Sequence, residues 1–259
     1  KKSIIKKIIL DNLVSIITPC YNSEQYIEDC VNSVIAQSYN KWEMIIVDDC
    51  SSDASVEKIM LLSDIDSRIR IFKLEENHGA AEARNIALED ANGSFIAFLD
   101  ADDFWEPLKL ERQINFMTKK NIAFSFTSYT ITSQSGDITN NVVRAPKEIS
   151  YNSYLKNTII GCLTVVINRK ITGSFQFPKI KSSHDMALWL EIMKRGYNAY
   201  GLQTSYANYR IVSTSNTSNK LHAAADVWRV YRDIENLSLL YSLFCFVNYA
   251  INALKKRIK

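Results

Sequence analysis

Three aspartates within four residues follow the apolar run at 95–99. Asp100, Asp102 and Asp103 repel one another, and burial at a strand end would increase that repulsion, so a cation is expected among them. Residues two apart in an extended segment point the same way, so Asp100 and Asp102 can face one ligand together. Carboxylates suit Mg²⁺ or Mn²⁺, which bridge diphosphates. The alternative is a solvated turn in which Asp103 caps the following helix.

A second pair of carboxylates, Asp48-Asp49, follows the apolar run at 43–47. The pair could cap the next helix, but the segment 51–53 offers equally good capping residues. The two carboxylates are therefore left to accept hydrogen bonds from a nucleobase or a ribose hydroxyl.

The segment 77–85 places a glycine, Gly79, where a loop enters a helix. A glycine there lets the backbone pass close to a ligand. Arg84 lies one turn into the helix and could pair with a phosphate or with a nearby carboxylate. The segment has neither of the common glycine-rich phosphate-binding patterns.

Asp185 begins a helical stretch with a large apolar face. It could simply interact with the N-terminal dipole of that helix. A carboxylate separate in sequence from a metal-diphosphate site is, however, what a transfer reaction needs to deprotonate its acceptor.

Alternating strands and helices are expected to position these residues. Such alternation predicts a mostly parallel sheet covered on both faces, with ligands at the carboxyl ends of the strands. In the second half, Gly196 should end the helix that begins at Asp185, and 213–219 reads as a mobile loop. The expected strands are 14–18, 43–47, 70–74, 95–99, 123–132 and 163–168, and the expected helices are 23–37, 56–62, 80–88 and 185–195.

The composition is that of a soluble globular protein. The chain has 259 residues, of which 47% are apolar and 23% charged, and its formal charge of +3 is too small to indicate nucleic acid as a partner. Its five cysteines are odd in number and lack zinc spacing, which favours reduced, cytosolic thiols. No signal peptide is expected, and the apolar stretch 237–254 is too polar and short for a membrane span.

The carboxyl end, from Trp228 to Ile251, carries apolar residues that can share one helical face, and a basic run at 255–259 follows. Such a helix could pack on the domain or in a homodimer. It could instead lie on a membrane, held by apolar burial and by attraction to anionic lipid.

Five segments of the chain, in order and covering about residues 13 to 215, resemble the inverting glycosyltransferase family 2. The resemblance implies an α/β GT-A fold, a Rossmann-like, mixed and mostly parallel sheet flanked by helices, over residues 1–219. The resemblance fades beyond residue 219, and the apolar and basic pattern of 220–259 predicts a C-terminal helical region that associates with membrane or dimerises. The matching segments are 14–22, 47–53, 79–85, 99–103 and 184–185.

The resemblance also implies how a nucleotide-sugar donor is bound. Pro19 and Tyr21 would line the nucleobase pocket, and Asp49 would contact the base. Arg84 would help to enclose the nucleotide. Arg210 would touch the diphosphate, although Ile211-Val212 stands where many relatives have a histidine shortly after the Tyr-Arg pair.

The implied catalytic residues lie in the two remaining segments. Asp102 would be the principal ligand of Mn²⁺ or Mg²⁺, with Asp100 reaching the ribose or the metal. Asp185 would be the general base of a single displacement that inverts the anomeric centre.

The implied reaction takes a sugar from a nucleotide-sugar, by preference a UDP-sugar, to a hydroxyl of a glycan or lipid-linked glycan. Its setting would be surface-polysaccharide synthesis, such as O-antigen, capsule or lipopolysaccharide, in the cytoplasm at the inner face of the membrane. One alternative is a sugar nucleotidyltransferase, but the segment 19–22 is not its glycine-rich loop. Another is a non-catalytic nucleotide-sugar or glycan-binding module, which the presence of Asp102 and Asp185 disfavours.

Overall fold

One sheet organises the computed structural model, which describes residues 10–180, 182–212 and 220–255. In the described residues its strand order is β3-β2-β1-β4-β9-β6-β10-β5, with β7 paired to β6 and β8 paired to β10. The strands are β1 (Leu10–Cys20), β2 (Trp42–Asp48), β3 (Ile69–Lys73), β4 (Gly93–Phe98), β5 (Phe104–Trp105), β6 (Phe124–Thr132), β7 (Ile138–Val143), β8 (Glu148–Ile149), β9 (Val166–Asn168) and β10 (Ala199–Arg210).

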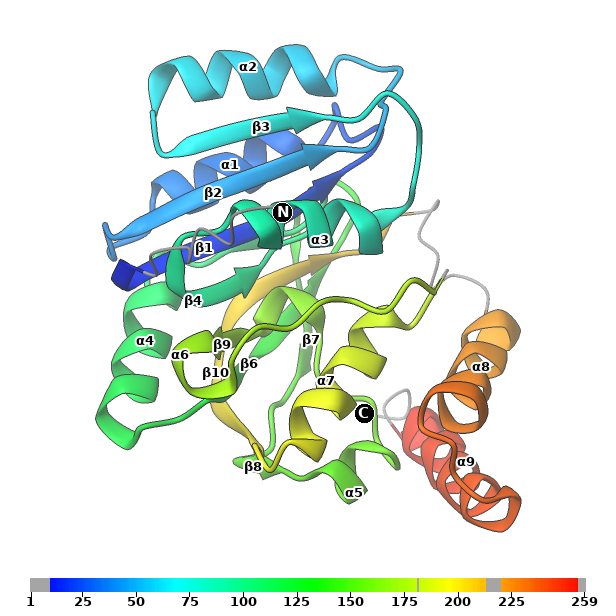
Figure 1. The fold of residues 1–259 in the computed structure, drawn as a ribbon. Helices are drawn as coiled ribbons and strands as arrows, with labels where there is room; N and C mark the ends of the chain where they lie inside the picture. The colour runs from blue at the N-terminus through cyan, green and yellow to red at the C-terminus, as the bar shows by residue number, and fades with distance from the viewer. Residues whose placement is uncertain (1–9, 181, 213–219, 256–259) are drawn as a thin grey trace, which may run out of the picture.

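The first half consists of the predicted alternating strands and helices. Strands β1 to β4 run parallel, and the helices between them are α1 (Ile27–Ile35), α2 (Ser55–Ile65) and α3 (Ala80–Asp90). Helices α1 and α3 cover opposite faces of these strands (Figure 1). Because both faces are covered, the strands are continuous apolar runs rather than alternating ones. The carboxyl ends of β1, β2 and β4 therefore meet at one edge.

Neighbouring residues of β1 supply two separate cores. Ile17 faces a cluster with α3 and, further along the sheet, Trp189. Ile16 faces a second cluster with α1 and Trp105. All four side chains are at most 3% exposed. The sheet is thus anchored from both sides, which makes its edge a rigid platform.

The second half confirms the predicted strand at 123–132 and most of the predicted helix at 185–195. The strand predicted at 163–168 is a 3₁₀ turn, η1 (Cys162–Thr164), followed by the short β9, which is antiparallel to both β4 and β6. Gly196, at φ 97°, follows the end of α7 as predicted. The helices here are α4 (Lys109–Lys120), α5 (Tyr151–Tyr154), α6 (Arg169–Thr172) and α7 (His184–Lys194).

The carboxyl end is helical but does not form the single continuous face expected for 228–251. Helix α8 (Lys220–Arg229) continues into a π-helical turn, η2 (Val230–Ile234), and α9 (Leu239–Lys255) follows. Asn236 lies between them at φ 51°, a left-handed conformation that asparagine tolerates better than most residues. The two helices lie side by side at one end of the molecule (Figure 1).

This helical pair is tied to the domain by polar contacts as well as apolar ones. Tyr231 is fully buried, and its hydroxyl donates to the backbone oxygen of Leu155. Glu235 accepts from Lys194 at 2.7 Å. In the described part of the chain, no helix is long and apolar enough to cross a bilayer. The loop predicted at 213–219 lies outside the described residues.

Candidate active site

Two loops at the carboxyl edge, 20–23 and 48–53, are bonded to each other. The backbone N–H of Asp49 donates to the oxygen of Cys20 at 2.8 Å, and that of Ser52 donates to Oδ1 of Asn22 at 2.8 Å. The loops follow Pro19, which pairs with Val47 in the β1–β2 register. Tyr21, in the first of these loops, is 53% exposed, so its ring is accessible to a ligand.

Asp48 and Asp49 both have local partners. The Asp48 carboxylate accepts from the N–H of Ser51 at 3.0 Å and is 1% exposed, so it takes part in the turn after β2. A contact of Asp48 with substrate stays a prediction. Asp49 is 3% exposed and accepts from the N–H groups of His78 and Gly79, each at 2.7 Å.

Asp49 thus holds the start of α3 against the sheet. Gly79 has φ 87°, a conformation that favours glycine. Each carboxylate oxygen of Asp49 keeps lone-pair capacity beyond its backbone bond. The contact of Asp49 with a nucleobase stays a prediction.

Arg84 joins two clusters that are far apart in the sequence. Its side chain is 5% exposed, and its guanidinium donates to Asp100 and, at 2.6 Å, contacts Nε2 of His184. The ring of Phe177 lies 5.4 Å from the guanidinium carbon. An arginine can only donate, so Nε2 of His184 accepts and its ring proton sits on Nδ1. Burial and the Arg84 charge lower the pKa of His184, in keeping with a neutral ring.

The aspartates that follow β4 differ in their partners and in their surroundings. Asp103 is 2% exposed and accepts from the backbone N–H of Arg210 at 2.9 Å. Its predicted role as a helix cap is wrong, because β5 intervenes and α4 begins only at Lys109. Burial and the neighbouring Asp100 raise the pKa of Asp102 to about 6.

The chemistry of Asp100 and Asp102 fits a divalent cation bound together with a diphosphate. Mg²⁺ and similar ions are commonly held by one or two protein carboxylates, with phosphate and water completing the shell. A cation would also relieve the repulsion that raises the pKa of Asp102. Among the described residues, no group of three or more histidine, cysteine or acidic side chains forms a metal site without such help.

Arg210 is held beside this run rather than pointing freely toward a ligand. It is 3% exposed, pairs with Asp29 of α1 at 2.8 Å and lies between the rings of Tyr26 and Phe104, at 5.0 and 5.3 Å. Its charge lowers the pKa of Asp102 in opposition to burial. The predicted contact of Arg210 with diphosphate remains a prediction.

Asp185 lies in the first turn of α7, next to His184. Its charge and that of Asp100 oppose the lowering of the His184 pKa, so both carboxylates lie within electrostatic reach of the imidazole. The fold therefore gathers Arg84, Asp100, Asp102 and Asp185 at one site. Sequence reasoning gave no role to His184, although its position beside Asp185 was the available signal.

Comparisons with known proteins identify the family of the chain. The family model described as "Glycosyl transferase family 2" matches residues 15–172. The chain is 51% identical over 246 residues to the "Putative teichuronic acid biosynthesis glycosyltransferase TuaG" of Bacillus subtilis (strain 168), covering 95% of this chain and 98% of that protein.

A second relative is named for a specific reaction. The chain is 42% identical over 249 residues to the "UDP-Glc:alpha-D-GlcNAc-diphosphoundecaprenol beta-1,3-glucosyltransferase WfgD" of Escherichia coli, covering 95% of each protein. Among solved structures, the fold matches the mannosyltransferase PcManGT of Pyrobaculum calidifontis, in complex with GDP-Man and Mn²⁺, with a TM-score of 0.69. That match has 16% identity and covers 95% of this chain and 75% of the other.

Proposed function

Because this chain belongs to glycosyl transferase family 2, we propose that it moves a sugar from a UDP-sugar to a hydroxyl of a lipid-linked glycan. The transfer inverts the anomeric centre and serves surface-polysaccharide assembly. The chain is a glycosyltransferase with the GT-A type of α/β sheet. Membership of this family excludes the two alternatives, a sugar nucleotidyltransferase and a non-catalytic binding module.

The observation that carries the proposal is the bridge made by Arg84. One guanidinium contacts the donor-side Asp100 and also His184, the neighbour of the acceptor-side Asp185. A transferase needs such proximity, because the acceptor hydroxyl must reach the donor's anomeric carbon while a base accepts its proton.

Several features support a uridine donor and a divalent metal. WfgD, named for UDP-Glc, is far closer in sequence than PcManGT, which was solved with GDP-Man and Mn²⁺. Asp100 and Asp102 would hold Mn²⁺ or Mg²⁺ against the diphosphate, with Pro19, Tyr21 and Asp49 around the base. A bound metal would supply Lewis-acid stabilisation of the leaving diphosphate.

Asp185 would act on the acceptor. Its carboxylate takes the proton of the acceptor hydroxyl as that oxygen attacks the sugar from the face opposite the diphosphate. Neutral His184, held by Arg84, supports the first turn of α7 from which Asp185 projects. Attack from the opposite face inverts the anomeric configuration.

A lipid-linked acceptor would bring the protein to the inner face of the membrane. Helix α9 exposes a row of large apolar side chains that includes Leu240, 80% exposed, and Val247, 55% exposed. The sequence continues into a basic run at 255–259. This combination supports peripheral contact with anionic lipid.

Vesicle co-sedimentation of the full chain tests that contact. We expect Leu240→Asp with Val247→Asp to reduce binding to anionic vesicles while leaving the melting temperature near that of the unmodified chain. Equal binding by both proteins would exclude α9 as the contact, and a change of mass in sedimentation velocity would instead indicate that the face mediates a homodimer.

The catalytic proposal is tested with purified protein, Mn²⁺ and a GlcNAc-diphospho-lipid acceptor. UDP-Glc, other UDP-sugars and GDP-Man are supplied separately, and release of nucleoside diphosphate and the anomeric configuration of the product are measured. We expect turnover with a UDP-sugar, loss of turnover in chelator and an inverted linkage. Turnover with GDP-Man alone would contradict the donor assignment, and a retained anomeric configuration would contradict the displacement.

A further inference from the structure

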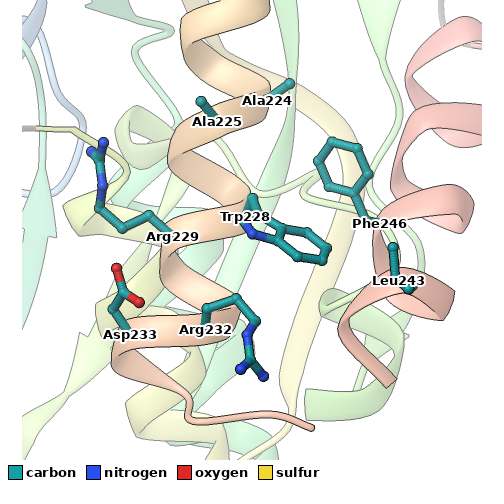
Figure 2. Close-up of a pocket in the computed structure, with 8 residues that line it drawn as sticks. All are labelled: Ala224, Ala225, Trp228, Arg229, Arg232, Asp233, Leu243 and Phe246. Carbon is teal, nitrogen blue, oxygen red and sulfur yellow. The ribbon is translucent and has the colours of Figure 1, made fainter. Parts of the chain in front are cut away.

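A hollow of about 650 Å³ lies along α8, η2 and α9, outside the carboxylate site. Its walls include Ala224, Trp228 and Arg232 from α8 and η2, and Leu243 and Phe246 from α9. Figure 2 shows Trp228 and Phe246 pointing toward each other across the space between the helices. Their ring centroids lie 5.6 Å apart with the rings nearly perpendicular. A volume of this size is typical of a small-molecule site.

The apolar wall continues onto the exposed face of α9. Leu243 is 46% exposed although it lines the hollow, and Leu239, one turn earlier, is 56% exposed. Leu239 and Leu243 are four residues apart in α9, so they share one helical face beside the hollow. The lining therefore suits an elongated apolar ligand that enters the hollow at one end.

Arg232 gives the hollow a cationic border. Its guanidinium donates to the backbone oxygen of Leu237, and among the described residues no carboxylate lies within ion-pair distance of it. Two other charged residues line the hollow, but they lie on the opposite side of α8 from α9 (Figure 2). These are Asp233 and Arg229, which pairs with Asp226 at 2.9 Å. An arginine beside an aromatic wall is well suited to a phosphate joined to an apolar chain.

We propose that this hollow binds the isoprenoid diphosphate of the lipid-linked acceptor, with the first isoprene units between Trp228 and Leu243 and a phosphate at Arg232. The inference rests on the proposed function, because it names the part of the acceptor that the chain recognises. Charge complementarity selects this occupant over a neutral lipid, and the aromatic wall formed by Trp228 and Phe246 favours a single chain over a flat bilayer surface.

Isothermal titration of the full chain with geranylgeranyl diphosphate, below the concentration at which it forms micelles, tests the inference. We expect binding that weakens by about tenfold or more in Arg232→Gln and in Leu243→Asp. Geranylgeraniol and inorganic pyrophosphate should each bind the unmodified chain more weakly by a similar factor, since each lacks half of the ligand. Leu61→Asp is the matched control, because Leu61 lies on α2, does not line the hollow and is 66% exposed.

Three results would overturn the inference. These are no binding of geranylgeranyl diphosphate, equal binding by all variants, or an equal loss in the Leu61→Asp control, which would show that the loss does not depend on the hollow. Melting temperatures of each variant establish that it is folded. Stabilisation of the same samples by UDP-Glc with Mn²⁺ is measured in parallel. If the donor stabilises the chain while the isoprenoid does not bind, the assignment of the hollow is wrong and the proposed function stands.

Discussion

At the scale of single residues, Arg84 connects the two halves of the candidate site. Its guanidinium is almost fully buried and contacts both Asp100 and His184. A buried guanidinium that loses one partner leaves a charged donor unsatisfied, which is more costly than the bond itself was worth. The bridge therefore makes the position of His184, next to Asp185, depend on the position of Asp100.

The proposed role of Asp185 as general base is tested by Asp185→Asn. The amide cannot accept the hydroxyl proton, so we expect turnover to fall by about 10²–10⁴-fold. Donor affinity should change little, because Asp185 is not among the residues assigned to the nucleotide. Nucleoside diphosphate release and titration with the UDP-sugar measure the two quantities. A large loss of donor affinity with unchanged turnover would assign Asp185 to the donor instead.

His184 is tested by a matched pair of variants. His184→Leu removes the acceptor for Arg84, and leaving that buried donor unpaired should cost about 1–3 kcal/mol in the free energy of unfolding. We also expect turnover to fall more than donor affinity, because the first turn of α7 loses its support. His184→Gln keeps an acceptor oxygen and should restore part of both losses. Identical behaviour of the two variants would show that the Arg84 contact is unimportant.

At the scale of elements, α4 contains a lysine that the site does not use. Lys109 is fully buried, its Nζ lies 3.0 Å from Oε1 of Gln113 and it lies 4.0 Å from the ring centre of Trp105. Burial lowers its pKa to about 7. Gln113 in turn donates to Ser125 and to the oxygen of Thr164, so this polar cluster joins α4, β6 and η1.

Lys109→Met is expected to change the pH dependence of stability. In the unfolded chain the lysine releases its proton near pH 10.4, and in the folded chain near pH 7. Between these values the unfolded state binds more protons, so Lys109 makes the unmodified chain more stable as pH rises, by at most about 1.4 kcal/mol per pH unit.

The measurement compares urea unfolding of the two proteins at pH 6.5 and pH 9. The unfolding free energy of the unmodified chain, relative to that of Lys109→Met, should be higher at pH 9 than at pH 6.5. An unchanged difference would mean that Lys109 titrates alike in the folded and unfolded states. A lower difference at pH 9 would contradict the sign of the pKa change.

The strands and helices of the first half were predictable because each is encoded in a local pattern of apolar residues. The hydrogen bond between Asp103 and Arg210 was not predictable. Their contact joins residues 107 positions apart, through a backbone donor at the end of β10. The insertion of β9 between β4 and β6 was likewise invisible in the sequence, because a three-residue strand carries too little pattern.

At the scale of the whole molecule, charge is unevenly distributed. The formal charge of +3 is small, yet lysine and arginine concentrate in the terminal segments, with 255–259 directly after the exposed apolar face of α9. Such an arrangement would orient the protein on an anionic surface with the α8–α9 pair toward the lipid.

Salt is expected to weaken this attachment without abolishing it. Raising NaCl from about 0.05 to 0.5 M shortens the Debye length to a few ångströms and should screen the basic residues. The apolar part of the contact is insensitive to screening, so some binding to anionic vesicles should remain. Co-sedimentation at both salt concentrations measures this. Salt-independent binding would contradict a role for the basic run.

The sequence alone determined the family, the alternating units and the candidate residues Asp100, Asp102, Arg84 and Asp185, because these features are encoded in short segments with characteristic spacing. Only the tertiary structure decided which side chains share a site. In it, Arg84 contacts His184, one hundred residues away, and Asp103 accepts a hydrogen bond from the backbone of Arg210. The carboxyl end folds into two helices that share a hollow. The physical reason is that long-range hydrogen bonds and buried charges depend on how elements pack, and local apolar periodicity carries no record of that packing.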